Sequence, residues 1–104
     1  MLRMTAYAAL AEPSRRAILD LLRGGERPVG ELVRRLRLSQ PGVSKHLKVL
    51  REAGLVEVRP DGKRRLYRLR AHPLAEVDGW LAPYREHWAA SLDALERHLE
   101  DNPS

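Results

Sequence analysis

The chain has 104 residues, a net charge of +5 and 43% hydrophobic residues. A chain of this length supports one compact domain with a small core, so we expect a single domain over residues 1–104. Cysteine is absent, which excludes disulfides and cysteine metal sites. The N-terminal segment has no long apolar run. The sequence therefore predicts neither a signal peptide nor a transmembrane helix, and we expect a cytoplasmic protein.

The charge is distributed unevenly along the chain. Residues 34–70 contain twelve basic and three acidic side chains, a net charge of +9, whereas residues 71–104 have a net charge of −5. Residues 1–33 are nearly neutral, at +1. A polyanion would be attracted to the middle segment and repelled by the C-terminal one, so we expect a nucleic acid as partner.

Three helices are expected in the first third of the chain. Apolar residues at helical spacing predict the first over residues 3–11. An acidic residue followed by proline, Glu12-Pro13, indicates the start of a second helix that ends near residue 23, before two glycines. A third helix is expected over residues 29–36, where valine and leucine recur at spacings of three and four.

The segment that follows is the most informative stretch of the chain. Ser39 is a good N-cap, and Gly54 is a natural stop for the helix between them. At about 100° per residue, this helix separates a polar, cationic face from an apolar face. The polar face consists of Gln40, Pro41, Ser44, Lys45, Lys48, Arg51 and Glu52. Gly42 falls on the apolar face, where we expect it to let the preceding helix approach closely.

A basic hairpin and a long helix complete the chain. Alternating strands are expected over residues 55–59 and 64–69, joined by a turn at residues 60–63. A helix is then expected from about Leu74 to Glu100, with a kink at Pro83. About five helices and a two-stranded hairpin, in this order, predict a mainly α fold, a helix-turn-helix with a wing.

The last helix carries a near-heptad apolar seam, which Trp80 broadens. So small a body cannot bury a seam of this length, and we therefore expect a two-fold homodimer that pairs through the first and last helices. The alternative is a last helix that packs only on its own domain. The expected interface residues are Tyr7, Leu10, Leu81, Tyr84, Trp88, Leu92, Leu95 and Leu99.

Nearly the whole chain, from about Leu10 to Leu99, resembles a known family. The segments ALAEPSRRAILDLL and VGELVRRLRLSQPGVSKHLKVLREAGLVEVRPDGKRRLYRL closely resemble the ArsR-type winged helix-turn-helix repressors of bacteria. The segment WLAPYREHWAASLDALERHL resembles a subgroup without the usual metal-site cysteines. The resemblance implies a cytoplasmic dimer that binds an inverted repeat of double-stranded DNA near a promoter and blocks transcription. We expect neither enzymatic activity nor a cofactor, because cysteine is absent and Ser44 and His46 lie on different faces of their helix.

The chain departs from this family at two positions. The family often has glycine where this chain has Arg37, and an arginine in the left-handed region costs about 1 kcal/mol. A phosphate contact would offset that cost. The third helix of the family usually opens on Ser or Thr, where Pro28 stands here, so a side-chain cap is lost although proline preorganises the first turn.

The resemblance assigns base contacts to the start of the fourth helix. Gln40 and Ser44 lie at the end that enters the major groove, with Pro41 and Lys45 beside them. Ser39, Lys48 and Arg51 are expected to meet phosphates, as are wing residues beside the turn. Strand alternation turns some wing residues away, and Lys63 and Arg65 are favoured. The expected DNA-binding set is Ser39, Gln40, Pro41, Ser44, Lys45, Lys48, Arg51, Lys63, Arg64 and Arg65, with Arg59 as a further wing candidate.

Other roles have weaker support in the sequence. His46 falls beside the apolar face, so a packed histidine bonded to backbone or phosphate is favoured over a base contact. Asp78, His87, His98 and Asp101 form no convincing metal set, and we expect no metal. An unknown small-molecule inducer stays open, because Trp80, Tyr84 and Trp88 could line an interface pocket. A metal-responsive repressor and an architectural or protein-binding winged helix without sequence preference are the alternative functions.

Overall fold

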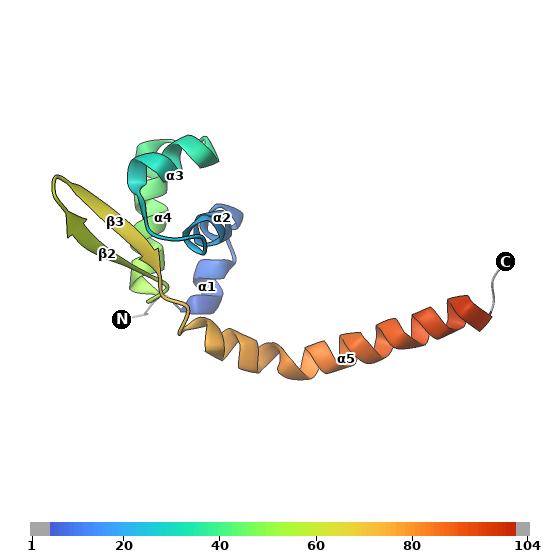
Figure 1. Cartoon of the computed structure of the whole chain (residues 1–104). Helices are drawn as coiled ribbons and strands as arrows, with labels where there is room; N and C mark the ends of the chain where they lie inside the picture. Colours follow the sequence, from blue (N-terminus) through green and yellow to red (C-terminus); the bar gives the residue numbers. More distant parts are fainter. Residues whose placement is uncertain (1–4, 102–104) are drawn as a thin grey trace. The chain divides into compact units, whose positions relative to one another are not determined.

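The computed structural model describes residues 5–101, which form five helices and three strands (Figure 1). These residues divide after Leu74 into two units, which are described separately. Among residues 5–101, no helix combines the length and apolarity that a membrane span requires. The elements are α1 (Ala6–Leu10), α2 (Pro13–Leu22), β1 (Arg27–Pro28), α3 (Val29–Leu36), α4 (Gln40–Glu52), β2 (Val56–Asp61), β3 (Arg64–Leu69) and α5 (Leu74–Asp101).

The core of the first unit joins the helices to the base of the hairpin. The predicted apolar face of α4 is confirmed, because Val43, Leu47 and Leu50 are all buried. Ile18 of α2 and Leu32 of α3 are fully buried as well. At about 1.5–3 kcal/mol for each large aliphatic side chain, burial of this kind is the main term that holds α4 in place.

The predicted helix boundaries of α2 and α4 are confirmed by their caps. Glu12 caps α2, since its carboxylate accepts a hydrogen bond of 3.0 Å from the backbone N–H of Arg15. Ser39 caps α4, since its hydroxyl accepts one of 3.1 Å from the backbone N–H of Gly42. Gly54 ends α4 with a φ of +75°, a conformation that glycine adopts without strain.

Arginines of α2 hold the C-terminal end of α1. The guanidinium of Arg15 donates to the carbonyl of Ala9 at 2.7 Å, and that of Arg16 donates to the carbonyl of Leu10 at 2.5 Å. The last carbonyls of a helix have no partner within the helix, so these contacts satisfy them. Helix α1 is shorter than the predicted range of residues 3–11, of which residues 3 and 4 lie outside the described residues.

The sheet has a third strand, which the prediction of a two-stranded hairpin missed. Strand β1 pairs antiparallel with β3, so the strand order is β1-β3-β2. A two-residue strand is too short to show alternation, which explains the error. The hairpin turn is also tighter than predicted, because β2 continues to Asp61 and pairs there with Arg64. Gly62 accommodates the turn with a φ of +64°.

The expected role of Gly42 is wrong. A Cβ atom at this position would lie 2.9 Å from the hydroxyl of Ser39, and no atom of α3 comes within 4 Å of it. The glycine therefore leaves room for the hydroxyl that caps its own helix, not for the preceding helix. Helical periodicity does not reveal this role, because the obstructing atom belongs to the cap residue, three positions earlier in the chain.

The second unit contains the helix α5 from its second residue onward, and the whole helix spans 28 residues. The helix axis changes direction in its N-terminal half, where Pro83 lies inside the helix (Figure 1). None of its residues is buried, and Trp88 and Leu92 are 51% and 64% exposed. Arg85 forms an ion pair of 2.7 Å with Asp78 along the same helix.

Candidate nucleic-acid interface

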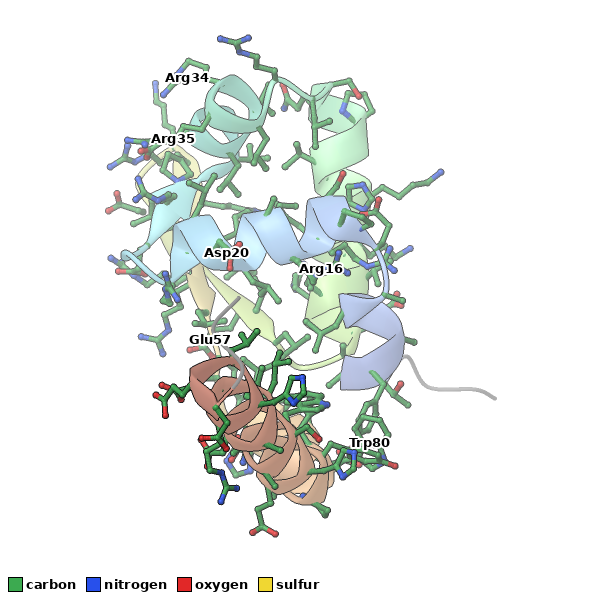
Figure 2. The ribbon with its side chains drawn as sticks, turned by 90° about the vertical axis from the view of Figure 1, so that its right-hand side faces the viewer. Arg16, Asp20, Arg34, Arg35, Glu57 and Trp80 are labelled. Carbon is green, nitrogen blue, oxygen red and sulfur yellow. The ribbon has the colours of Figure 1, made fainter. Side chains whose placement is uncertain are left out.

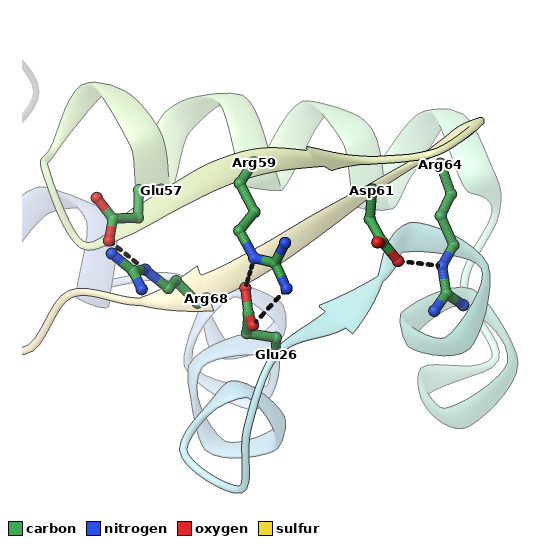
Figure 3. A network of polar contacts seen from close by, with 6 residues as sticks. All are labelled: Glu26, Glu57, Arg59, Asp61, Arg64 and Arg68. Carbon is green, nitrogen blue, oxygen red and sulfur yellow. Dashed lines mark hydrogen bonds and ion pairs between the residues drawn. The ribbon is translucent and has the colours of Figure 1, made fainter.

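Helix α4 and the wing form one side of the first unit. From the end of α4 the chain turns into β2, and the hairpin runs back beside α4 (Figures 1 and 3). The hairpin turn is thereby directed toward the end of the body at which α4 begins. In helix-turn-helix proteins the N-terminal residues of such a helix contact base edges in the major groove, so this surface is the candidate interface.

The polar face of α4 is open to solvent along its whole length. Gln40 and Ser44 are exposed at its start, and Lys48 and Arg51 are exposed further along. Ser39, Pro41 and Lys45 are exposed as well, so all the predicted α4 residues are accessible to a partner. The buried side chains Val43 and Leu47 hold the opposite face against the body, which keeps this polar face turned outward.

Arg37 occupies the turn before α4 in a left-handed conformation. Its φ is +56° and its ψ is +37°, and among the described residues it is the one non-glycine residue with a positive φ. The predicted cost of arginine at this position therefore applies. Its backbone N–H bonds the carbonyl of Val33 at 3.0 Å and closes α3. Pro28 begins α3 without a side-chain cap, as the sequence indicated.

His46 faces the body and not the exposed polar face. The histidine is half-buried, and its Nε2 lies 3.9 Å from a carboxylate oxygen of Glu12. The expectation of a packed histidine fits this position, although the nearest polar neighbour is a carboxylate at the start of α2. The same carboxylate oxygen caps α2.

Three arginines of the wing are paired with carboxylates (Figure 3). Arg59 donates two hydrogen bonds to Glu26, at 2.7 and 3.1 Å. Arg64 bonds Asp61 at 3.1 Å, and Arg68 bonds Glu57. The hydrogen bonds from Arg59 hold the pKa of Glu26 below its ordinary value, and Glu26 in turn raises the pKa of Arg59. Three of the twelve basic side chains of residues 34–70 are therefore balanced by neighbouring carboxylates at the wing.

Two wing cations have no such partner. Lys63 and Arg65 are exposed and form no ion pair with residues 5–101. Alternation along β3 places Arg65 opposite Pro60 and on the other face from Arg64 and Arg68. These are the two residues that the sequence favoured, and they keep their charge available. Arg64, also in the predicted set, shares its charge with Asp61.

An open groove separates α4 from the wing. It has a volume of about 490 Å³. Its cations, Lys48 and Arg51, come from α4, and Val56 and Val58 supply apolar surface from β2. Glu52 and Glu57 also line it, which makes its walls mixed in charge. Two cations of the polar face of α4, Lys48 and Arg51, therefore also line the groove beside the wing.

A second ionic cluster connects the start of α3 to the sheet. Glu31 accepts hydrogen bonds from Arg27 at 2.5 Å and from Arg35 at 3.1 Å. Partial burial acts to raise the pKa of Glu31, but the two arginines outweigh it and hold that pKa below its ordinary value. Arg34 and Arg35 extend from α3 at the same edge of the body (Figure 2). These ion pairs hold the start of α3 against β1.

The acidic and histidine side chains that the sequence analysis set aside as metal ligands lie on α5. Residues 5–101 contain no group of three histidine, cysteine, aspartate or glutamate side chains arranged to hold a metal. Asp78, one of those candidates, bonds Arg85. The expected DNA contacts of individual residues stay predictions, because the structure places these residues without a partner.

Sequence reasoning missed Glu26. It lies between α2 and β1, and its partner Arg59 follows 33 residues later. No local pattern connects an acidic residue in a loop to an arginine in a strand so far along the chain. The weak signal available was the excess of arginine in the hairpin, which implies that some carboxylates fold against it.

Comparison with known proteins gives consistent results. A family model described as a helix-turn-helix domain matches residues 10–59. The HTH-type transcriptional regulator Rv2034 of Mycobacterium tuberculosis is 53% identical over 72 residues, which cover 69% of this chain and 67% of that protein. The transcriptional repressor SmtB of the same species is 49% identical over 69 residues, or 66% of this chain and 51% of SmtB. The chain therefore spans about half to two thirds of these relatives.

A solved structure agrees with the sequence matches. The ArsR-like transcriptional regulator from Rhodococcus sp. RHA1 has a TM-score of 0.67 and 30% sequence identity, over 88% of this chain and 86% of that one. The likeness thus extends over most of both chains. Together with the capped, solvent-facing α4 and its wing, these matches show that the chain belongs to the ArsR-type winged helix-turn-helix transcriptional regulators, a family of DNA-binding proteins.

Proposed function

We propose that this protein is a cytoplasmic, homodimeric repressor that recognises an inverted repeat in duplex DNA and acts without catalysis or a cofactor. The observation that carries the proposal is the exposed polar face of α4, which begins with Gln40 and Ser44 and continues into unpaired cations. Glutamine forms paired hydrogen bonds with adenine, and serine hydroxyls adapt to several bases. A surface that served only to attract phosphates would not need these two uncharged side chains.

Phosphate contacts surround the proposed base contacts. Lys48 and Arg51 lie further along α4, and Lys63 and Arg65 lie at the wing. All four are exposed and none has an ion pair within residues 5–101, so they are available to neutralise phosphates. We assign the lysine and arginine contacts to affinity and register, and the Gln40 and Ser44 contacts to sequence preference.

The proposed dimer supports this mode of binding. The seam of α5 leaves Trp88, Leu92, Leu95 and Leu99 between 51% and 64% exposed, which is a large apolar surface for a small protein. A second copy of the same helix offers the matching surface. On this proposal residues 1–104 act as one DNA-binding domain with dimerisation helices at its ends. Two copies of α4 would then enter successive major grooves, and the bound dimer would block polymerase.

The experiment that tests the proposal is selection from a random duplex library at near-physiological salt. An enriched inverted repeat supports a sequence-specific dimer. Enrichment of no sequence, with binding that disappears as salt rises, contradicts it and favours an architectural role.

Two substitutions then separate the proposed roles. Gln40→Ala should relax the preference at one position of each half-site, by about 1–3 kcal/mol. Lys48→Gln should weaken binding to every duplex alike and flatten the salt dependence by about one unit per half-site. An unchanged sequence preference in Gln40→Ala would contradict the assignment of base reading to this face.

A further inference from the structure

The sheet has three strands only close to the body, where β1 pairs with β3. Pro28 of β1 lies opposite Leu66 of β3, and Leu66 lies opposite Arg59 of β2. Beyond this row the hairpin continues as two strands that carry the turn with Lys63. A two-stranded ribbon is marginally stable by itself, so its direction depends on what holds it at this row.

Arg59 of this row forms an ion pair with Glu26, the residue that directly precedes β1 (Figure 3). Glu26 belongs to the connection between α2 and β1, so the pair links the body to the wing. The other two ion pairs of the wing, Glu57 with Arg68 and Asp61 with Arg64, lie entirely within the hairpin. Arg59 donates through Nε and Nη2 to both carboxylate oxygens, a forked geometry that fixes direction as well as distance.

We propose that Glu26 is a positioning residue that sets the direction of the wing, so that Lys63 and Arg65 reach the DNA backbone. This inference rests on the DNA binding of the proposed function. The pair is half-exposed, and ion pairs of this kind add little to global stability. Its effect is therefore local. Arg59, a wing candidate in the sequence, serves as the partner of Glu26 and not as a phosphate contact.

Because Glu26 is negatively charged, electrostatic attraction and wing positioning predict opposite changes in DNA affinity when this residue is replaced. Removal of a carboxylate beside DNA should strengthen binding if simple attraction decides, because the protein becomes more positive. If Glu26 directs the wing, its removal should weaken binding although the net charge rises. Glu57 provides the matched control, since Glu57→Gln removes the same charge from an arginine pair that lies within the hairpin.

The experiment measures affinity for a duplex of fixed sequence at several salt concentrations. For Glu26→Gln we expect weaker binding and a salt dependence flatter by about one to two units per wing, as the contacts of Lys63 and Arg65 are lost. For Glu57→Gln we expect equal or tighter binding. Thermal melting should change little in either variant. Binding by Glu26→Gln that is as tight as that of Glu57→Gln overturns the proposal.

A charge exchange provides the second readout. Glu26→Arg alone should weaken binding through repulsion of Arg59, and addition of Arg59→Glu should restore both the affinity and the salt dependence. A double variant as weak as the single one overturns the proposal. A nonspecific duplex suffices for these measurements. A wild-type protein that binds it but selects no operator would contradict sequence-specific repression, while the test of Glu26 would still give its answer.

Discussion

The two units of the chain differ in how they use apolar side chains. In the first unit, residues from Ala6 to Leu66 contribute a buried core that includes Ile18, Leu47 and Leu50. In α5 no residue is buried, although the helix contains two tryptophans and a leucine seam. The first unit thus has the apolar contacts needed to hold α4 and the wing, whereas α5 has an apolar surface to offer. DNA contact and assembly should therefore be separable by mutation.

The largest expected effect is the loss of stability when a core leucine is truncated, compared with the same change on the apolar seam of α5. Leu50→Ala removes a fully buried side chain and should lower the free energy of unfolding by about 2–5 kcal/mol at every protein concentration. Leu99→Ala is the same chemical change at a residue that is 60% exposed. Its effect should depend on protein concentration, because Leu99 belongs to the proposed dimer interface. Urea unfolding at two concentrations measures both, and equal behaviour would remove the distinction between the units.

Replacement of a seam leucine by lysine should dissociate the proposed dimer and leave the fold of the chain unchanged. Leu95→Lys places a charge in the proposed interface and should raise the dimer dissociation constant at least about tenfold, since burying an unpaired charge is costly. Asp93→Lys is the control, because Asp93 lies on the opposite side of α5 from the seam. Sedimentation of both variants at micromolar concentration decides. A Leu95→Lys protein as dimeric as the wild type would contradict the proposed interface.

A smaller effect concerns the turn that positions α4. Arg37→Gly should stabilise the first unit by up to about 1 kcal/mol, because glycine tolerates the observed φ of +56°. Chemical denaturation measures the gain. Arg37→Gln, which removes the charge and keeps the strain, should give none. A loss of stability in the glycine variant would mean that the arginine side chain contributes more than its backbone costs.

The smallest expected effect concerns the dependence of the free energy of unfolding on pH. The pKa of Glu31 lies below its ordinary value of 4.5, so its ionised form is favoured in the folded state. The stability that its ion pairs contribute is present above the unfolded pKa and is lost as the pH falls through the lower, folded pKa. Unfolding measured between pH 3 and 6 should therefore show a shallower dependence on pH in Glu31→Gln than in the wild type. Equal slopes would contradict this role of Glu31.

Local signals predicted most of the fold and the makeup of the candidate site. The cap Ser39, the stop Gly54 and the two faces of α4 depend on residues a few positions apart, so helical geometry suffices to place them. The pairing of β1 with β3 and the bond of Glu26 to Arg59 join residues more than 30 positions apart. Which partners meet at such distances depends on the whole packing, and alternation or charge counts do not specify it.

Neither the sequence nor the structure identifies the molecules that bind at the candidate site. The sequence counts twelve basic residues in positions 34–70 but does not show which of them are neutralised internally. The structure shows that Arg35, Arg59, Arg64 and Arg68 are paired with carboxylates. The operator, the dimer and any inducer stay predictions, because each requires a second molecule beside this chain.

One carboxylate at the start of α2 has neighbours on two helices, and we expect this to restrict the residues that position 12 accepts. Glu12 caps that helix and also lies 3.9 Å from His46 on α4. Serine or aspartate would preserve the cap but is too short to keep the same approach to the histidine. Position 12 should therefore covary with position 46 among related sequences, with glutamate retained where the histidine is retained.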